Sequence, residues 1–109
     1  MLKKRLIACL SLWQGHLVKT RNFTDYQIIG NPVTSIEEFN AWAIDEIVLL
    51  DLSIDSTYDF ARNDYRHENP DTLSGIITYI SKSCFVPLTV GGGIRTVEDV
   101  RIRLKAGAD

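Results

Sequence analysis

The chain has 109 residues, a length that suits one domain with a single hydrophobic core and excludes a two-domain protein. Hydrophobic residues make up 45% of the chain and charged residues 24%, a globular composition that excludes an intrinsically disordered protein. The net charge of −2 gives no basic footprint for nucleic acid or for an anionic membrane. No stretch approaches the roughly 18–20 apolar residues of a membrane span. The sequence therefore predicts neither a nucleic-acid partner nor a membrane partner.

The two cysteines, Cys9 and Cys84, lie far apart in apolar surroundings and have no Cys-x-x-Cys spacing. We expect buried thiols in a reducing compartment, which makes the cytoplasm the expected location. The basic residues 3–5 do not open a secretion signal, because only three apolar residues precede Cys9 where a signal needs roughly 7–15. The sequence predicts no metal and no cofactor.

The first predicted strand spans residues 5–10. Its apolar run from Leu6 to Leu10 is too short for a helix and lacks alternation, which is typical of a strand buried on both faces. Residues 11–31 are predicted to be a long loop with a small hairpin around residues 16–19.

A helix is predicted over residues 32–43, because Pro32 suits a first turn and the apolar spacing that follows is helical. Thr34 or Ser35 is the expected cap, and the glutamates at 37 and 38 are expected in the first turns, where the helix dipole favours acids.

The second strand is predicted within residues 44–52, with a doubly buried centre at 47–50. Asp51 is its most informative residue, because a carboxylate at the C-terminal end of such a strand lies where α/β folds place their sites. Residues 53–70 are polar and form a predicted loop that is longer than most βα connections.

A helix over residues 71–83 and a strand over residues 85–90 follow, and the strand runs directly into Gly91, Gly92 and Gly93. Thr96 with Asp99 three residues later predicts a capping box for a last helix. That helix is expected over residues 97–105, with Val100 and Leu104 facing inward.

The predicted order is therefore β-α-β-α-β-α in an α/β fold, and residues 107–109 read as the start of a fourth strand. Periodicity alone leaves two architectures open, a small open sheet or the opening of an eight-unit barrel.

The triple glycine has a chemical use, because without Cβ atoms a phosphate can approach the backbone N–H groups closely. It is neither a Walker loop nor a G-x-G-x-x-G motif, which argues against nucleoside triphosphates and dinucleotides. By itself the run is equally compatible with a tight structural turn.

Longer motifs carry a specific resemblance. The string at residues 87–95, Pro-Leu-Thr-Val-Gly-Gly-Gly-Ile-Arg, resembles the third-strand signature of ribose-phosphate-binding (βα)8 barrels. Residues 1–10, the Gly15-x-Leu-Val-Lys and Asn22-Phe motifs, residues 30–33 and residues 45–51 are similar to the cyclase subunits of imidazole glycerol phosphate synthase. Those barrels take ammonia from a glutaminase partner in histidine biosynthesis. The resemblance implies that residues 1–109 are the first three βα units of one (βα)8 TIM-barrel domain.

The resemblance also assigns roles. Gly92 and Gly93 would hold one phosphate of a bis-phosphorylated ribulosyl substrate, Lys19 would lie on a mobile first loop that closes over it, and Asp51 would lie near the floor of the site. Three residues would belong to the entrance for ammonia and the interface with the glutaminase subunit: Arg5, Glu46 and Asp109.

Each assignment has a plainer alternative. Lys19 and Arg5 also suit ordinary strand-end charges, and Glu46 suits a local ion pair with Arg5 that contributes only ~0–1 kcal/mol. Asp51 also suits a carboxylate that orients the following loop.

Ser11 departs from the family pattern, which has a catalytic aspartate at this position. A serine with a pKa far above neutrality cannot replace a carboxylate as a base without an activating partner. Ser11 resembles instead a paralogous branch found with surface-polysaccharide genes, in which ammonia is directed to an amidino or acetamidino sugar. A third possibility is a catalytically silent protein that binds phosphate and docks a glutaminase, and a fourth is a phosphosugar isomerase that needs no glutaminase. We expect the 109-residue chain alone to be inactive and to associate.

Overall fold

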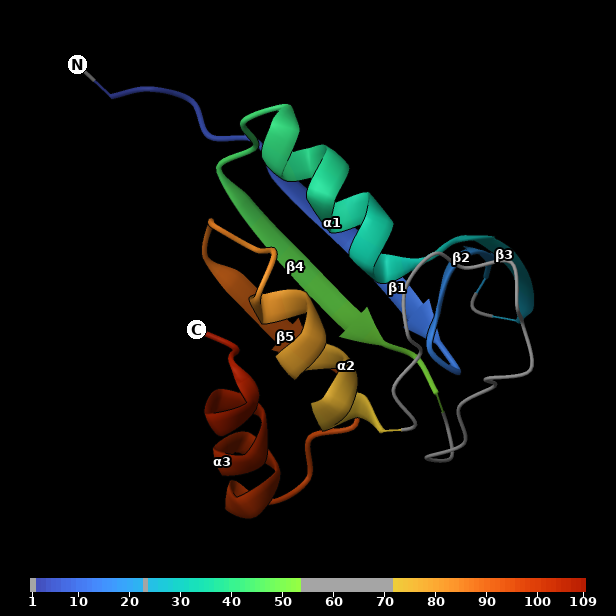
Figure 1. The fold of residues 1–109 in the computed structure, drawn as a ribbon. Helices are drawn as coiled ribbons and strands as arrows, with labels where there is room; N and C mark the ends of the chain where they lie inside the picture. The colour runs from blue at the N-terminus through green and yellow to red at the C-terminus, as the bar shows by residue number, and fades with distance from the viewer. Residues whose placement is uncertain (1, 23, 54–71) are drawn as a thin grey trace.

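The computed structural model describes residues 2–22, 24–53 and 72–109, which form a five-stranded sheet with helices (Figure 1). Along the sheet the strand order is β3-β2-β1-β4-β5. The strands are β1 (Ile7–Trp13), β2 (His16–Arg21), β3 (Asp25–Gly30), β4 (Glu46–Asp51) and β5 (Leu88–Gly91). Strands β1, β4 and β5 are parallel, whereas β2 and β3 are antiparallel to their neighbours.

Each of the three parallel strands is followed along the chain by a helix. The helices are α1 (Pro32–Ala41), α2 (Leu73–Ser81) and α3 (Val97–Ala106). In Figure 1, α1 and α2 lie over one face of the parallel strands, and α3 lies beside α2. This alternation of parallel strands and helices confirms the predicted order of elements.

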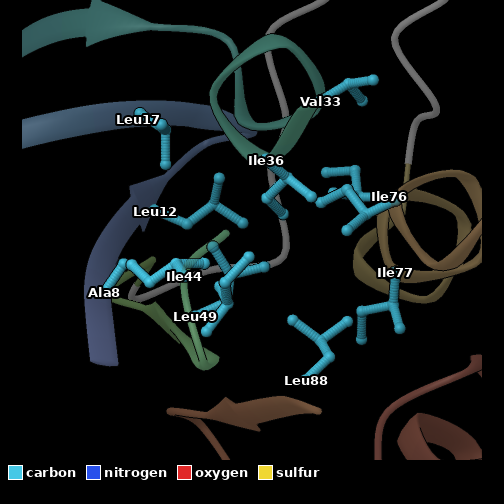
Figure 2. Close-up of a cluster of buried hydrophobic side chains, with 12 residues drawn as sticks. Ala8, Leu12, Leu17, Val33, Ile36, Ile44, Leu49, Ile76, Ile77 and Leu88 are labelled. Carbon is cyan, nitrogen blue, oxygen red and sulfur yellow. The ribbon is translucent and has the colours of Figure 1, made fainter. Parts of the chain in front are cut away.

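The core lies between this sheet face and the helices (Figure 2). Register explains its composition: Ala8 pairs with Ile47, and Ile47 pairs with Leu88, so that all three side chains point to the same face. The cluster is completed by apolar residues from β1, β2, β4, α1, α2 and the α1–β4 connection, which are Leu12, Leu17, Val33, Ile36, Ile44, Leu49, Ile76, Ile77 and Ile80.

The opposite sheet face carries the other half of each strand, including Ile7, Cys9 and Ser11. Cys9 is exposed, so its predicted burial is wrong; Cys84 is half-buried, and desolvation raises the pKa of its thiol. The predicted double burial of β1 fails for the same reason, because the described helices cover one face only.

The predicted loop 11–31 is also wrong in most of its length, because β1 continues to Trp13 and turns directly into β2. Gln14 and Gly15 both have positive φ, +50° and +86°, the geometry of a two-residue type I′ hairpin. The Trp13 and Tyr26 rings stack at a centroid distance of 4.9 Å, which ties β3 to the end of β1.

The N-terminus of α1 is set by its neighbouring residues. Asn31, not Thr34 or Ser35, caps α1, since its Oδ1 accepts the Val33 N–H at 2.8 Å. Pro32 occupies the first turn as predicted. The glutamates at 37 and 38 lie beyond the first turn, because α1 begins at Pro32.

The predicted capping box of α3 is confirmed, with Thr96 and Asp99 exchanging hydrogen bonds. Val100 and Leu104 are 41% and 51% exposed, so their predicted inward orientation is wrong in the described residues. Of the 53–70 segment, only Ser53 lies within the described residues. No helix in the described ranges is both long and apolar enough to cross a membrane.

Candidate functional site

The carboxyl ends of β1, β4 and β5 lie side by side and carry half of the predicted site residues. Ser11 pairs with Leu50, and Leu50 pairs with Gly91, so these three positions form one row across the sheet. Asp51 and Gly92 each follow by one residue. The structure therefore brings Ser11, Asp51 and the glycine run to the edge of the sheet where α/β proteins bind ligands.

Gly92 is packed directly against the end of β4. A Cβ atom built on Gly92 would lie 2.1 Å from the Asp51 carbonyl oxygen, and the φ of Gly92 is +93°. Gly93 also has a positive φ, +66°, but a Cβ atom there would meet nothing closer than 3.8 Å. Gly92 is thus required for close approach of two strand ends, while the Gly93 position is open.

Asp51 has an identified local partner. Its Oδ1 accepts the Ser53 N–H at 3.0 Å, and Ser53 Oγ accepts the Gln14 N–H at 2.8 Å. This chain links the loop after β4 to the β1–β2 turn, which supports the loop-orienting interpretation of Asp51. A role toward substrate stays a prediction.

Lys19 lies in β2, within the β2–β3 hairpin that connects the first parallel strand to α1. It is exposed and pairs with Gln27 of β3. Because β1 separates β2 from β4 in the sheet, Lys19 belongs to the hairpin beside the site and not to its floor.

The opposite end of the parallel strands carries the charged residues. Arg5 Nη2 lies 3.0 Å from Glu46 Oε2, and the two side chains are 57% and 23% exposed. Asp109 is fixed at the same end, because its Oδ2 accepts the Leu88 N–H at 2.9 Å while its own N–H donates to Leu88 O at 2.8 Å. Glu46 lies four strand residues before Leu50, the partner of Ser11, and is therefore about 13 Å from Ser11 along the strands, given about 3.3 Å per residue.

The glycine run is anchored to α3 by Asp99. Its Oδ2 accepts the backbone N–H groups of Arg95 and Thr96, both at 3.0 Å. These bonds, the one from Arg95 foremost, lower the pKa of Asp99 below its usual 3.8. Because the folded-state pKa is depressed, the carboxylate stabilises the box above the unfolded-state pKa, and this stabilisation is lost as pH falls through the folded-state value.

Below about pH 4 we therefore expect the amides of Arg95 and Thr96 to lose protection from hydrogen exchange. Exchange measured by NMR between about pH 5 and pH 2.5, corrected for intrinsic rates, tests this expectation. Asp99→Asn is the matched control, since its amide oxygen accepts without titrating. Equal pH profiles for the two proteins would contradict the assignment.

Arg103 of α3 also reaches the glycine run, although nothing in the sequence pattern singles it out. Its Nη2 donates to Gly92 O at 3.3 Å and its Nη1 to Asp99 O at 3.1 Å. The only sequence signal is its place one helical turn after Asp99, which the capping box already fixes.

No group of three or more candidate metal ligands occurs within the ranges that the structure describes.

Parallel strands alternating with helices, with a glycine run at the carboxyl ends, define a protein of the βα-barrel class. The family model described as histidine biosynthesis protein matches residues 5–109, and the chain belongs to this family. The family fold is a (βα)8 barrel, of which this chain supplies the first three βα units, with the β2–β3 hairpin after the first strand. The family contains histidine biosynthesis enzymes.

Proposed function

We propose that the protein acts as the cyclase-type subunit of imidazole glycerol phosphate synthase, which uses ammonia from a glutaminase subunit on a bis-phosphorylated ribulosyl substrate. One observation carries this proposal: the Arg5–Glu46 ion pair joins the segment just before β1 to the first residue of β4, at the N-terminal end of these adjacent parallel strands. The Arg5 side of this pair is exposed to solvent, and surface ion pairs add only ~0–1 kcal/mol of stability, so stability is a weak reason for its presence.

The two ends of the strands then have separate tasks. Ammonia enters past Arg5 and Glu46, beside the surface that holds Asp109. Substrate binds at the other end, where Gly93 N–H receives a phosphate and Lys19 on the hairpin supplies a positive charge. Charged substrate and small neutral nucleophile approach from opposite ends, which keeps the phosphate away from the Glu46 carboxylate.

A second candidate rests on Ser11. Ring closure requires proton transfer, and a serine hydroxyl lacks the carboxylate that would accept a proton near neutral pH. Ser11 lies on the open sheet face at the carboxyl end of β1, where a catalytic side chain belongs. This favours a paralogous subunit that uses ammonia to aminate or amidinate a sugar of surface-polysaccharide synthesis.

The test is turnover of the ribulosyl substrate by the complete protein, supplied either with ammonium or with glutamine and the glutaminase subunit. Ser11→Asp is compared with the unsubstituted protein. We expect Ser11→Asp to raise ammonium-dependent turnover by about 100-fold or more, the range that a positioned acid or base contributes.

Turnover by the unsubstituted protein would assign the cyclase reaction and show that another residue is the base. No turnover by the unsubstituted protein, whether or not Ser11→Asp restores it, with ammonium-dependent product formed on a sugar substrate, would assign the paralogous reaction. Stimulation of the glutaminase without any product would favour the silent docking protein. Turnover of a phosphosugar isomerase substrate without ammonia would contradict every ammonia-dependent alternative.

A further inference from the structure

Arg103 joins the phosphate-binding segment to its helix through two backbone carbonyls. One guanidinium nitrogen contacts Gly92 O at 3.3 Å and the other contacts Asp99 O at 3.1 Å. Its Nε is enclosed and has no hydrogen-bond partner among the described residues. An enclosed donor without an acceptor costs free energy, so a residue that merely covers α3 would not need a guanidinium here.

The contact of Arg103 with Gly92 O also fixes the direction of the Gly93 N–H. The carbonyl of Gly92 and the N–H of Gly93 belong to one planar trans peptide, so they point in opposite directions. Arg103 holds the carbonyl toward α3. The Gly93 N–H is therefore turned away from α3.

Gly92 is fixed from a second side as well. Its Cα lies so close to the β4 end that an added Cβ would be 2.1 Å from Asp51 O. With Asp51 on one side and Arg103 on the other, the Gly92–Gly93 peptide has little freedom to flip. Two glycines with positive φ would otherwise allow such a flip at low cost.

We propose that Arg103 is a positioning residue for the phosphate site: by holding Gly92 O, it keeps the Gly93 N–H directed toward the substrate phosphate. The inference rests on the proposed phosphate-binding role of Gly92 and Gly93. Pre-orienting this donor avoids an ordering cost when the anion binds. The positive charge of Arg103, next to the glycine run, further favours an anion there.

The test titrates the complete protein with inorganic phosphate and follows the Gly93 amide by NMR. We expect Arg103→Leu to weaken phosphate binding about tenfold, the effect of losing one hydrogen bond to a charged group, with the melting temperature of the protein still measurable. Arg101→Leu is the matched control, because Arg101 lies on the same helix but donates to Glu98 at 2.7 Å and is 59% exposed. It removes the same charge without touching Gly92.

Arg103→Lys separates charge from geometry. Lysine keeps the charge but lacks the fork that spans two carbonyls, so we expect it to recover only part of the affinity. Full recovery, or equal losses in Arg101→Leu and Arg103→Leu, would overturn the positioning role. So would an Arg103→Leu protein that melts earlier but binds phosphate normally when folded.

Absence of phosphate binding to the unsubstituted protein would overturn the inference together with the phosphate site. Normal phosphate binding and the expected Arg103 effect, without ammonia-dependent turnover, would support the inference while removing the proposed reaction.

Discussion

Gly92→Ala is expected to destabilise the protein by about 3 kcal/mol, whereas Gly93→Ala is expected to cost about 1 kcal/mol. Both positions have positive φ, so an L side chain is strained at either one. Only at Gly92 does the new methyl group also meet rigid backbone, 2.1 Å from Asp51 O and 2.9 Å from the carbonyl carbon. The end of β5 would have to move away from β4 to accommodate it.

Urea unfolding of the two variants, followed by far-ultraviolet circular dichroism, measures this difference. Gly93→Ala serves as the control because it changes the same residue type in the same run, with its Cβ in open space apart from Arg103 Nη2 at 3.8 Å. Equal losses of unfolding free energy would mean that the φ values alone set the cost, and that close strand approach does not require Gly92.

This comparison also bears on the phosphate site. If Gly92→Ala unfolds part of the site, phosphate affinity falls for structural reasons. Gly93→Ala keeps the backbone N–H and the local fold, so any loss of affinity there comes from the methyl group at the anion. The two variants thus separate the strand packing of Gly92 from the binding role proposed for Gly93.

Local signals in the sequence were enough to predict the order of the parallel strands and the helices, but not strands β2 and β3. Pro32 at a helix start and the Thr96–Asp99 box are governed by neighbouring residues, and both are confirmed. The glycine run after an apolar strand was likewise predicted at its observed place, beside the end of β4.

A small hairpin was predicted around residues 16–19, but its turn was misplaced and its length underestimated, because the observed turn at Gln14 and Gly15 does not use the usual residues. Type I′ turns favour Asn-Gly, and here Gln14 takes the first position with φ +50°. The stacking of Trp13 on Tyr26 stabilises the hairpin despite the positive φ of Gln14. Because the two rings lie on different strands, this contact produces no recognisable pattern in the sequence.

The burial of a side chain and its contacts with distant residues depend on how the helices pack on the sheet. The periodicity of the sequence does not reveal this packing. Cys9 and Val100 both read as buried, yet each faces away from the described helices and strands. Arg103 reads as an ordinary solvent-exposed arginine on a helix. Its contact to Gly92 arises only because α3 folds back beside the end of β5.

Leu49→Ala is expected to lower the free energy of unfolding by about 3–4 kcal/mol, because a large buried side chain is replaced by a cavity. Leu49 is 0% exposed within the buried cluster of Figure 2. It lies in the middle of β4 and pairs with Leu10 of β1 and Val90 of β5. Leu6→Ala is the matched control at 69% exposure, and it should cost less than about 1 kcal/mol.

Urea unfolding measures both losses, and a Leu49→Ala cost near that of Leu6→Ala would show that the sheet is not packed on its helices as described. The substitution also separates stability from chemistry. Leu49 points to the helix face, whereas Ser11 and Glu46 lie on the other face of the sheet, so the variant weakens the fold without altering either. When measured under folded conditions, Leu49→Ala should therefore keep the activity proposed for the Ser11 face, since the buried core sets how much of the protein is folded.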